Sequence, residues 1–305
     1  MKTRILLDSG APTLYHKYAR GAGTAAVKSG MMGSHLKDRK HDNFDWLDNP
    51  DYLAYRERYA QYILQHKDKI EVYTNLDIVN NPHATWENQQ YFESLGLSPL
   101  PVWHFGSDIS WLKHYLRKGY DHIGIGGLVP NPYTTLRPAL DEIWSQYLTD
   151  ANGFPLVKVH GFAATSIPLM CRYPWHSVDS ASWVKYAAFG GIMIPAAIRG
   201  VAKYTERPYK ISVSGKSPLQ KKKDMHITNI GSPALEKYLL DYIASQGFVL
   251  GLSEFDGDKE IVIEPGLVNR PEIRCQFNAL YYMGLRDELP PWPWPFKATK
   301  GLSLW

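Results

Sequence analysis

Three aspartates of this sequence, Asp8, Asp77 and Asp179, lie at the ends of short apolar runs. Two carboxylates that face each other can act on the bond to an anomeric carbon. One attacks the sugar C1′, and the other moves a proton to or from the leaving group. This chemistry covers both sugar hydrolysis and the exchange of one nucleobase for another. Asp8 and Asp179 are therefore the predicted catalytic pair, with Asp77 as a third carboxylate beside them.

The remaining strand-end candidates are imidazoles, glycines and small neighbours of the aspartates: Ser9, Gly10, His104, Gly126, Gly127, Leu128, His160 and Gly161. Each has a simpler explanation when taken alone. An aspartate after a strand is most often a capping or turn residue, a histidine is most often a core side chain, and paired glycines are a turn. Together these residues predict a functional site, because all of them fall at the same end of the expected strands.

Short apolar runs alternate with amphipathic segments along the chain, which is typical of parallel βαβ units. The segments with helical spacing are 52–65, 84–95, 109–117, 136–148 and 181–188. Eight runs predict a closed (β/α)₈ TIM-type barrel, in which the carboxyl ends of the strands line the active site. These runs are 5–7, 70–76, 101–105, 122–125, 156–160, 177–179, 191–195 and 209–213.

The predicted organisation is a single catalytic barrel domain over residues 1–305. Its core covers about residues 1–230, and a short C-terminal extension covers about 231–305. The extension contains a further helix at 233–245 and a closing segment at 275–285. Its Pro-rich end, 290–296, cannot be a helix, and we expect its tryptophans to pack on the body or on a partner.

The composition excludes several classes of protein. The chain has 305 residues, of which 44% are hydrophobic, and it holds only two cysteines. Two cysteines cannot form a four-ligand cysteine zinc site, and no nucleotide-cofactor motif follows a strand. We therefore expect no metal and no cofactor. The longest apolar runs are too short to span a membrane, and the start of the chain does not read as a signal peptide, so we expect a cytoplasmic location.

Two basic stretches are candidate phosphate-binding segments, although solvated loops would read the same way. The formal net charge is +4, so charge alone does not indicate nucleic acid. Ten Trp and twenty Tyr suit stacking on bases, and they suit carbohydrate equally well. The predicted nucleic-acid-binding residues are Lys37, Arg39, Lys40, Arg172, Lys216, Lys221, Lys222 and Lys223.

Four of these motifs, in this order over about residues 1–200, resemble those of the tRNA-guanine transglycosylases. The matching segments are Leu7-Asp8-Ser9-Gly10, Leu76-Asp77-Ile78, Ile123–Val129 and Val178-Asp179-Ser180. The resemblance implies that Asp8 is the general acid/base, that Asp77 recognises guanine, that Gly126-Gly127-Leu128 lie under the base, and that Asp179 is the nucleophile. His104 falls where the family has a recognition Gln, and His160-Gly161 where it has a Met-Gly turn.

The chain departs from the tRNA enzymes in two places. It lacks their zinc subdomain, and Ser180–Trp183 replaces the segment that reads the anticodon. Segments 160–165 and 172–183 are more similar to the DNA 7-deazaguanine transglycosylases, in particular the phage-encoded ones. This resemblance implies exchange of guanine in DNA for a free 7-deazaguanine base, such as 7-cyano-7-deazaguanine, which would protect phage DNA from restriction.

Three alternatives stay open at this point. The first is an exchange enzyme acting on tRNA, since no residue visibly reads or rejects a 2′-hydroxyl. The second is a glycoside hydrolase, which would not need the Gly126-Gly127-Leu128 segment under a flat base. The third is a catalytically silent nucleic-acid-binding subunit, against which the pair Asp8 and Asp179 argues. The sequence leaves the oligomeric state open.

Overall fold

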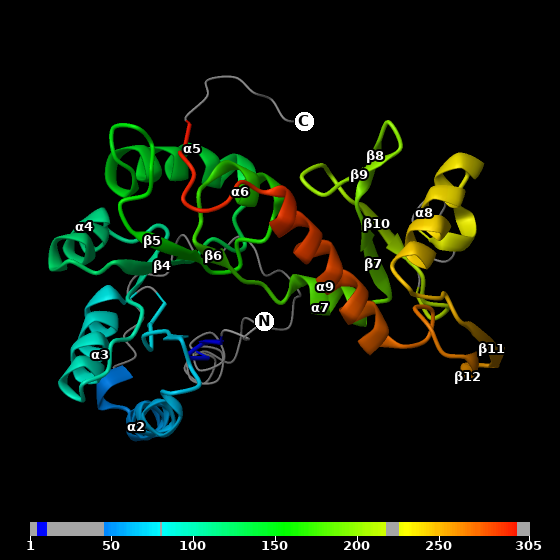
Figure 1. Ribbon diagram of the computed structural model, residues 1–305. Helices are drawn as coiled ribbons and strands as arrows, with labels where there is room; N and C mark the ends of the chain where they lie inside the picture. The colour runs from blue at the N-terminus through cyan, green and yellow to red at the C-terminus, as the bar shows by residue number, and fades with distance from the viewer. Residues whose placement is uncertain (1–4, 11–45, 80, 218–225, 298–305) are drawn as a thin grey trace. The chain divides into compact units, whose positions relative to one another are not determined.

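The computed structural model describes residues 5–10, 46–79, 81–217 and 226–297 (Figure 1). The chain divides into two compact units. Unit 1 contains residues 1–164, 172–179 and 292–305, and unit 2 contains residues 165–171 and 180–291. The predicted barrel core, about residues 1–230, covers most of unit 1 and part of unit 2.

Unit 1 contains a run of parallel strands in chain order, as predicted. Each strand pairs with the next one in parallel, except that β2 and β3 are joined by a single parallel bridge between Thr74 and Leu100. Parallel strands in sequential order are the pattern that βαβ units produce. Within the described part of unit 1 these strands are β1 (Leu6–Leu7), β2 (Val72–Tyr73), β3 (Val102–His104), β4 (His122–Gly126), β5 (Lys158–Gly161) and β6 (Ser177–Val178).

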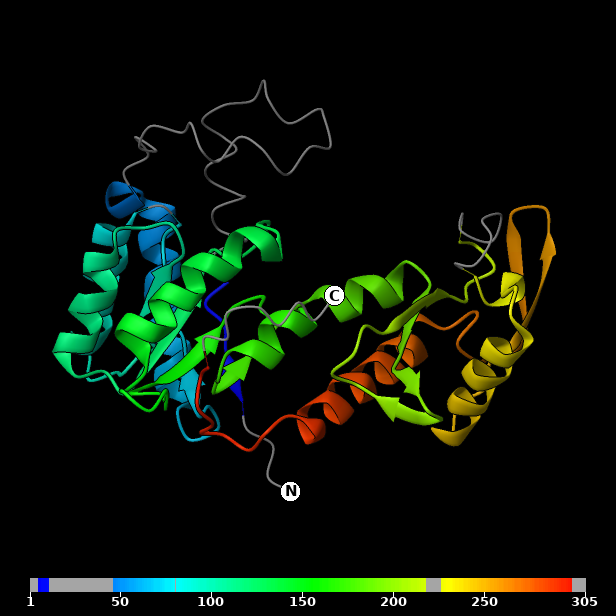
Figure 2. The same ribbon diagram turned by 90° about the horizontal axis from the view of Figure 1, so that it is seen from above.

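Helices connect these strands and lie outside them (Figures 1 and 2). Asn49, Asn81 and Asp108 cap the first three, each accepting a hydrogen bond from a backbone N–H in the first turn. The helices of unit 1 are α2 (Pro50–His66), α3 (Pro82–Ser94), α4 (Ile109–Lys118) and α5 (Tyr133–Ile143), with a 3₁₀ turn η1 (Trp46–Asp48) before α2 and a π-helical turn η2 (Trp144–Leu148) after α5. Helix α6 (Ile167–Arg172) belongs to unit 2 except for its last residue.

The Pro-rich segment near the C-terminus packs on unit 1. Phe296 is buried, its ring lies 5.5 Å from that of Tyr173, and its N–H donates to the carbonyl of Gly153 at 2.8 Å. Trp292 donates its indole N–H to the carbonyl of Pro174 at 3.0 Å. The predicted packing on the body is thus confirmed for Trp292.

Unit 2 mixes antiparallel strands with helices. Its elements are α7 (Ser182–Ala188), β7 (Gly191–Ile194), β8 (Ala196–Ile198), β9 (Val201–Lys203), β10 (Tyr209–Ser212), a 3₁₀ turn η4 (Ile227–Asn229), α8 (Pro233–Ser245), β11 (Leu252–Asp256), β12 (Lys259–Glu264) and α9 (Pro271–Glu288). The range of α8 agrees with the predicted helix, whereas α9 extends beyond the predicted closing segment 275–285 at both ends. Buried apolar residues of β7, β10, α8 and α9 form the core of this unit.

The seventh and eighth predicted strands differ from expectation. They correspond to β7 and β10, which pair antiparallel with each other. The expectation of parallel βαβ pairing is wrong for them. The connection between them holds the hairpin β8–β9 and no helix, and parallel neighbours need a longer crossover, usually helical. Among the described helices, none is long and apolar enough to cross a bilayer.

Candidate active site

The predicted site residues of unit 1 lie at the carboxyl ends of its parallel strands. Asp8 follows β1, His104 ends β3, Gly126 ends β4, and Asp179 follows β6. Asp77 lies four residues after β2. Each of these strands is paired with, or bridged to, the next one in the chain, and the charges of Asp77 and Asp179 act on Asp8. The three carboxylates therefore lie near one another, and their roles stay a prediction.

The turn that carries Asp8 is tied to neighbouring elements. The N–H of Ser9 donates to Oγ1 of Thr74 at 2.8 Å, and the Tyr55 hydroxyl donates to the carbonyl of Ser9 at 2.7 Å. Gly10 has a φ of +72°, which a residue with a side chain rarely adopts, and its N–H donates to Oδ1 of Asp8 at 3.4 Å. The segment after β2 and helix α2 thus hold this short turn in place, and one hydrogen bond within the turn supports it.

The carboxyl group of Asp8 has a raised pKa. Desolvation by the surrounding protein is the largest cause, although the side chain still reaches solvent. The negative charges of Asp77 and Asp179 raise the pKa further, while the N–H groups of Gly10 and Ser9 oppose the shift. The three carboxylates are therefore close enough to affect one another, and Asp8 is the one that holds a proton more readily than an ordinary aspartate.

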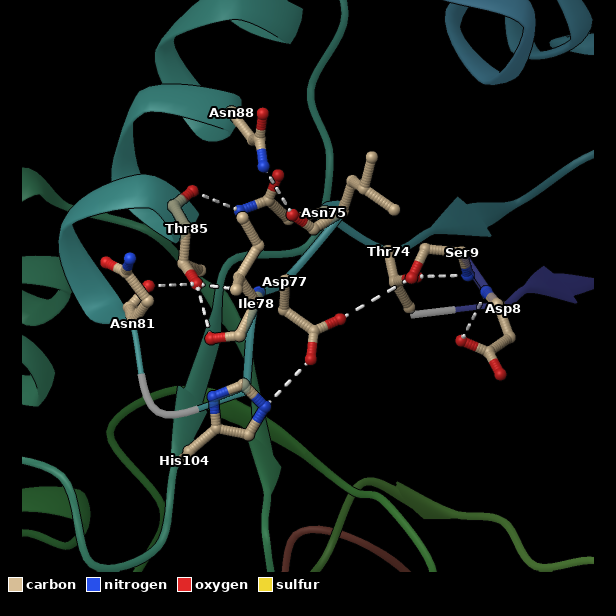
Figure 3. Close-up of polar contacts among 12 residues, drawn as sticks. Asp8, Ser9, Thr74, Asn75, Asp77, Ile78, Asn81, Thr85, Asn88 and His104 are labelled. Atoms are coloured by element: carbon tan, nitrogen blue, oxygen red, sulfur yellow. Dashed lines mark hydrogen bonds and ion pairs between the residues drawn. The ribbon is translucent and has the colours of Figure 1, made fainter. Parts of the chain in front are cut away.

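Asp77 lies between an imidazole and a hydroxyl (Figure 3). Its Oδ2 is 2.8 Å from Nε2 of His104, and its Oδ1 accepts from the Ser9 hydroxyl at 3.4 Å. The side chains of Asp77 and His104 are only 14% and 9% exposed, so this pair is largely shielded from water. The carboxylate is held from two sides and has little freedom to rotate.

A polar network behind Asp77 holds its backbone (Figure 3). Thr85 accepts from the N–H of Ile78 at 2.8 Å, and Asn88 donates to the carbonyl of Leu76 at 2.8 Å. Both side chains are fully buried. Since buried polar groups of this kind fix a single geometry when they are paired, helix α3 sets the position of the segment that carries Asp77.

Gly126 and Gly127 leave room for the residues of β3. A Cβ atom on Gly126 would lie 2.9 Å from Cδ2 of His104, so the imidazole packs directly on the backbone of β4. Gly127 has a φ of +71°, and a Cβ there would lie 3.2 Å from the backbone of Phe105. Leu128 is buried at 1% exposure. The predicted Gly126-Gly127-Leu128 segment therefore lies beside His104.

Asp179 is accessible to solvent, with a side chain that is 46% exposed. The N–H of Ala163 donates to its Oδ1 at 2.8 Å, and its own N–H donates to the carbonyl of Gly161 at 3.3 Å. Ala163 has a φ of +56°, which is uncommon for a residue other than glycine. The loop after β5 thus holds one oxygen of Asp179.

His160 lies beneath Asp179. It is 2% exposed, its Nδ1 is 2.8 Å from the Ser177 hydroxyl, and its Nε2 is 3.8 Å from Oδ1 of Asp179. Burial lowers the pKa of His160, against the opposing charge of Asp179. Gly161, the next residue, leaves no space for a side chain because a Cβ would lie 2.7 Å from that of Ala164.

Of the predicted phosphate-binding residues, the structure describes Arg172 and Lys216, and both form ion pairs with carboxylates. Arg172 donates two N–H groups to Asp141 at 2.6 and 2.7 Å, which occupies its guanidinium inside unit 1. Lys216 belongs to unit 2, is 59% exposed and pairs with Glu260 at 3.1 Å. Binding of phosphate by either stays a prediction. The other predicted residues lie outside the described ranges: Lys37, Arg39, Lys40, Lys221, Lys222 and Lys223.

Four further residues hold the predicted ones, and sequence reasoning missed them. Thr74 and Tyr55 fix the Asp8 turn, Ala163 anchors Asp179, and Ser177 pairs with His160. A polar residue inside an apolar run was the signal available for Thr74. Nothing in the sequence marks Ala163, since its contribution comes from the backbone.

The three carboxylates are suited to different chemical roles. Asp8 can carry a proton, Asp179 can present an anchored carboxylate to an incoming atom, and Asp77 beside His104 can accept hydrogen bonds from a bound ring.

Within the described residues, no three His, Cys, Asp or Glu side chains lie close enough to hold a metal ion. Comparison of the chain with known protein families, curated proteins and solved structures finds no match.

Proposed function

We propose that the chain is a transglycosylase that replaces guanine in DNA with a 7-deazaguanine base through a covalent sugar–Asp179 intermediate. The observation that carries this proposal is the set of three carboxylates that follow parallel strands of unit 1 and lie in three different environments. Asp8 has a raised pKa, Asp77 is held by His104, and Asp179 is accessible and anchored. The parallel strands of unit 1, after which all three carboxylates lie, would be the scaffold of the site. The alternation of eight apolar runs with helical segments is the reason to propose a barrel, and its seventh and eighth strands would be the antiparallel pair β7 and β10.

The first half of the reaction removes guanine. The target nucleotide leaves the stack, because its C1′ cannot be reached inside a duplex. Asp179 attacks C1′, the bond from C1′ to the base nitrogen breaks, and the base takes a proton from Asp8. The raised pKa of Asp8 favours the protonated form that this step needs.

The second half inserts the new base. The ring nitrogen of the 7-deazaguanine attacks C1′, its proton passes to Asp8, and the bond from C1′ to Asp179 breaks. Both bases would occupy the same slot, where Asp77 accepts from the ring N–H and amino group. The backbone N–H groups of Gly127 and Leu128 would donate to O6. His104 faces Asp77, so we assign it to holding that carboxylate.

The choice of DNA follows the motif resemblance, and the partners of the reaction would be DNA and the free base in the cytoplasm. The test is to incubate the protein with labelled guanine and either single-stranded DNA, duplex DNA or tRNA. We expect label in DNA and a protein–DNA adduct that survives denaturation. Label in tRNA alone would identify the RNA-acting alternative, and release of free sugar ends without base uptake would identify a hydrolase.

Substitution of Asp179 tests whether this residue is the nucleophile. Asp179→Asn should abolish both label uptake and adduct, a loss of at least about 10³-fold. Asp121→Asn is the matched control, because Asp121 is exposed and precedes β4, at the opposite end of the strands. Uptake of label by Asp179→Asn at the rate of the control would overturn the proposal.

A further inference from the structure

Asp179 has one oxygen that is engaged and another that the contacts described above do not involve. Both the Ala163 N–H at 2.8 Å and Nε2 of His160 at 3.8 Å approach the same atom, Oδ1. Two groups that converge on one carboxylate oxygen fix the orientation of the carboxyl plane. Oδ1 is therefore the anchored oxygen, and Oδ2 is the one left to attack.

The contacts of the buried His160 imidazole favour one of its two neutral tautomers. Its Nδ1 is 2.8 Å from the Ser177 hydroxyl, which can donate or accept. Its Nε2 is buried and has no hydrogen-bond partner within 3.5 Å among the described residues. If Nδ1 carried the proton, a bare lone pair on Nε2 would face the carboxylate at 3.8 Å, which is unfavourable. If the Ser177 hydroxyl donates to Nδ1, an N–H faces the carboxylate instead.

We propose that Ser177 holds His160 as the neutral Nε2–H tautomer, and that this N–H orients Asp179 and stabilises its negative charge. The inference rests on the proposed function for its catalytic consequence. His160 is thereby a positioning residue that acts through Asp179, rather than a contact of the base.

The consequence falls on the second half of the exchange. While the sugar is attached to Oδ2, Asp179 is an ester and carries no charge. When the incoming ring nitrogen displaces it, the C1′–Oδ2 bond breaks and the electron pair returns to the carboxylate. An N–H that already faces Oδ1 stabilises that returning charge without rearrangement. The Ala163 N–H acts in the same direction from the other side.

The charges around His160 agree with a neutral imidazole. The groups that influence it are Asp179, which favours the protonated ring, and His176, which opposes it. Burial is the largest effect and lowers its pKa.

The first test is spectroscopic and needs no substrate. The full chain with ¹⁵N-labelled histidine is examined by NMR, and the signals of His160 are assigned by their loss in His160→Gln. We expect the proton on Nε2 at neutral pH, a mixture of tautomers in Ser177→Ala, and a lower pKa of His160 in Asp179→Asn. A proton on Nδ1 in the wild type would overturn the proposal, as would a pKa insensitive to Asp179→Asn.

The second test separates positioning from packing. His160→Gln can place an amide N–H near the position of Nε2, whereas His160→Met fills similar space without a donor. We expect the adduct to break down about tenfold more slowly in His160→Met, with KM for the free base unchanged, and a rate near wild type in His160→Gln. Equal rates in the two variants would overturn the catalytic part.

The two experiments also separate this inference from the proposed function. If no adduct forms with any nucleic acid, the transglycosylase proposal fails, and the NMR result still decides the tautomer and its link to Asp179. If the adduct forms and the tautomer is wrong, only the inference fails. Thermal unfolding of each variant confirms that the protein examined is folded.

Discussion

Nε2 of His104 lies 2.8 Å from Oδ2 of Asp77, and both side chains are almost fully buried. The imidazole therefore contacts Asp77, the carboxylate that we propose binds the base. Together with the Ser9 hydroxyl on Oδ1, it presets the direction of the remaining acceptor positions of Asp77. Pre-orientation of this kind contributes to affinity because less freedom is lost on binding.

Gly126 tests this relationship. In Gly126→Ala the new Cβ would lie 2.9 Å from Cδ2 of His104, so the imidazole must shift from the position in which it contacts Asp77. We expect KM for the free base to rise about tenfold with little change in kcat, because binding weakens while the sugar chemistry is untouched. Steady-state exchange kinetics measure both constants.

The double variant with His104→Ala is the control for that prediction. If the effect of Gly126→Ala passes through His104, adding it to His104→Ala should cause little further loss, because the two changes are coupled. If the two changes raise KM by fully additive amounts, the effect of Gly126→Ala does not pass through His104.

Asp8 should reduce stability at neutral pH. Its pKa in the folded chain is above the ordinary value of 3.8. Below 3.8 the carboxyl is protonated in both folded and unfolded chains. As the pH rises through the folded pKa, ionisation favours the unfolded chain, so stability is lost. Asp8→Asn removes this cost, and we expect a melting temperature roughly 1–2 °C higher at pH 7, since solvent screens the partly exposed group.

The pH dependence of that gain is the check. Calorimetry at pH 7 and at pH 4 should show that the gain shrinks as the pH falls toward 3.8, and Asp121→Asn serves as the exposed control. A gain that is equal at both values, or a loss at pH 7, would show that ionised Asp8 does not destabilise the fold. Exchange activity should fall in the same variant, because the proton carrier is gone.

The ion pair between Arg172 and Asp141 should stabilise unit 1. Two N–H donors reach the carboxylate at 2.6 and 2.7 Å, and the Tyr173 hydroxyl donates to it at 2.9 Å. Arg172→Lys keeps the charge and loses the paired geometry, which we expect to cost about 1–3 kcal/mol in urea unfolding.

The exposed pair Lys237–Asp241 is the matched control, and Lys237→Ala should cost less than about 0.5 kcal/mol. DNA affinity at low salt should be similar in Arg172→Lys and in the wild type. Unchanged stability together with weaker DNA binding would mean that Arg172 serves phosphate instead of Asp141.

Phe296 should stabilise unit 1 although it lies far along the chain. It is 6% exposed and packs on Tyr173. Phe296→Ala should lower the free energy of unfolding by about 3 kcal/mol, as expected for removal of a buried ring. Phe189, 79% exposed in unit 2, is the control, and Phe189→Ala should change stability by less than about 0.5 kcal/mol. Equal costs for the two would contradict the packing described.

The sequence predicted the strand ends of unit 1 well, because an apolar run followed by a polar or glycine residue is a local signal. Asp8, His104 and Asp179 lie at strand ends as that signal predicted, whereas Asp77 lies four residues after β2, which ends earlier than expected. The helix α8 was predicted with the bounds that the structure has. Both kinds of feature depend on residues adjacent in the chain.

Features that depend on distant residues were not predicted. The antiparallel pairing of β7 with β10 depends on the hairpin between them, and the hairpin lacks a strong turn dipeptide. The partners of the site residues, such as Thr74 for Ser9 and Ser177 for His160, depend on strand register. Register decides which side chain faces which neighbour, and strands as short as β1, β2 and β6, with two residues each, carry too little pattern to define it.

The division of the chain has a consequence for its synthesis. Unit 1 is interrupted by unit 2, and Phe296 returns to pack on Tyr173 and Gly153. A ribosome releases residues in order, so the aromatic surface around Tyr173 stays uncovered while more than a hundred further residues are made. Unit 1 therefore completes its aromatic packing only after the whole of unit 2 has been synthesised.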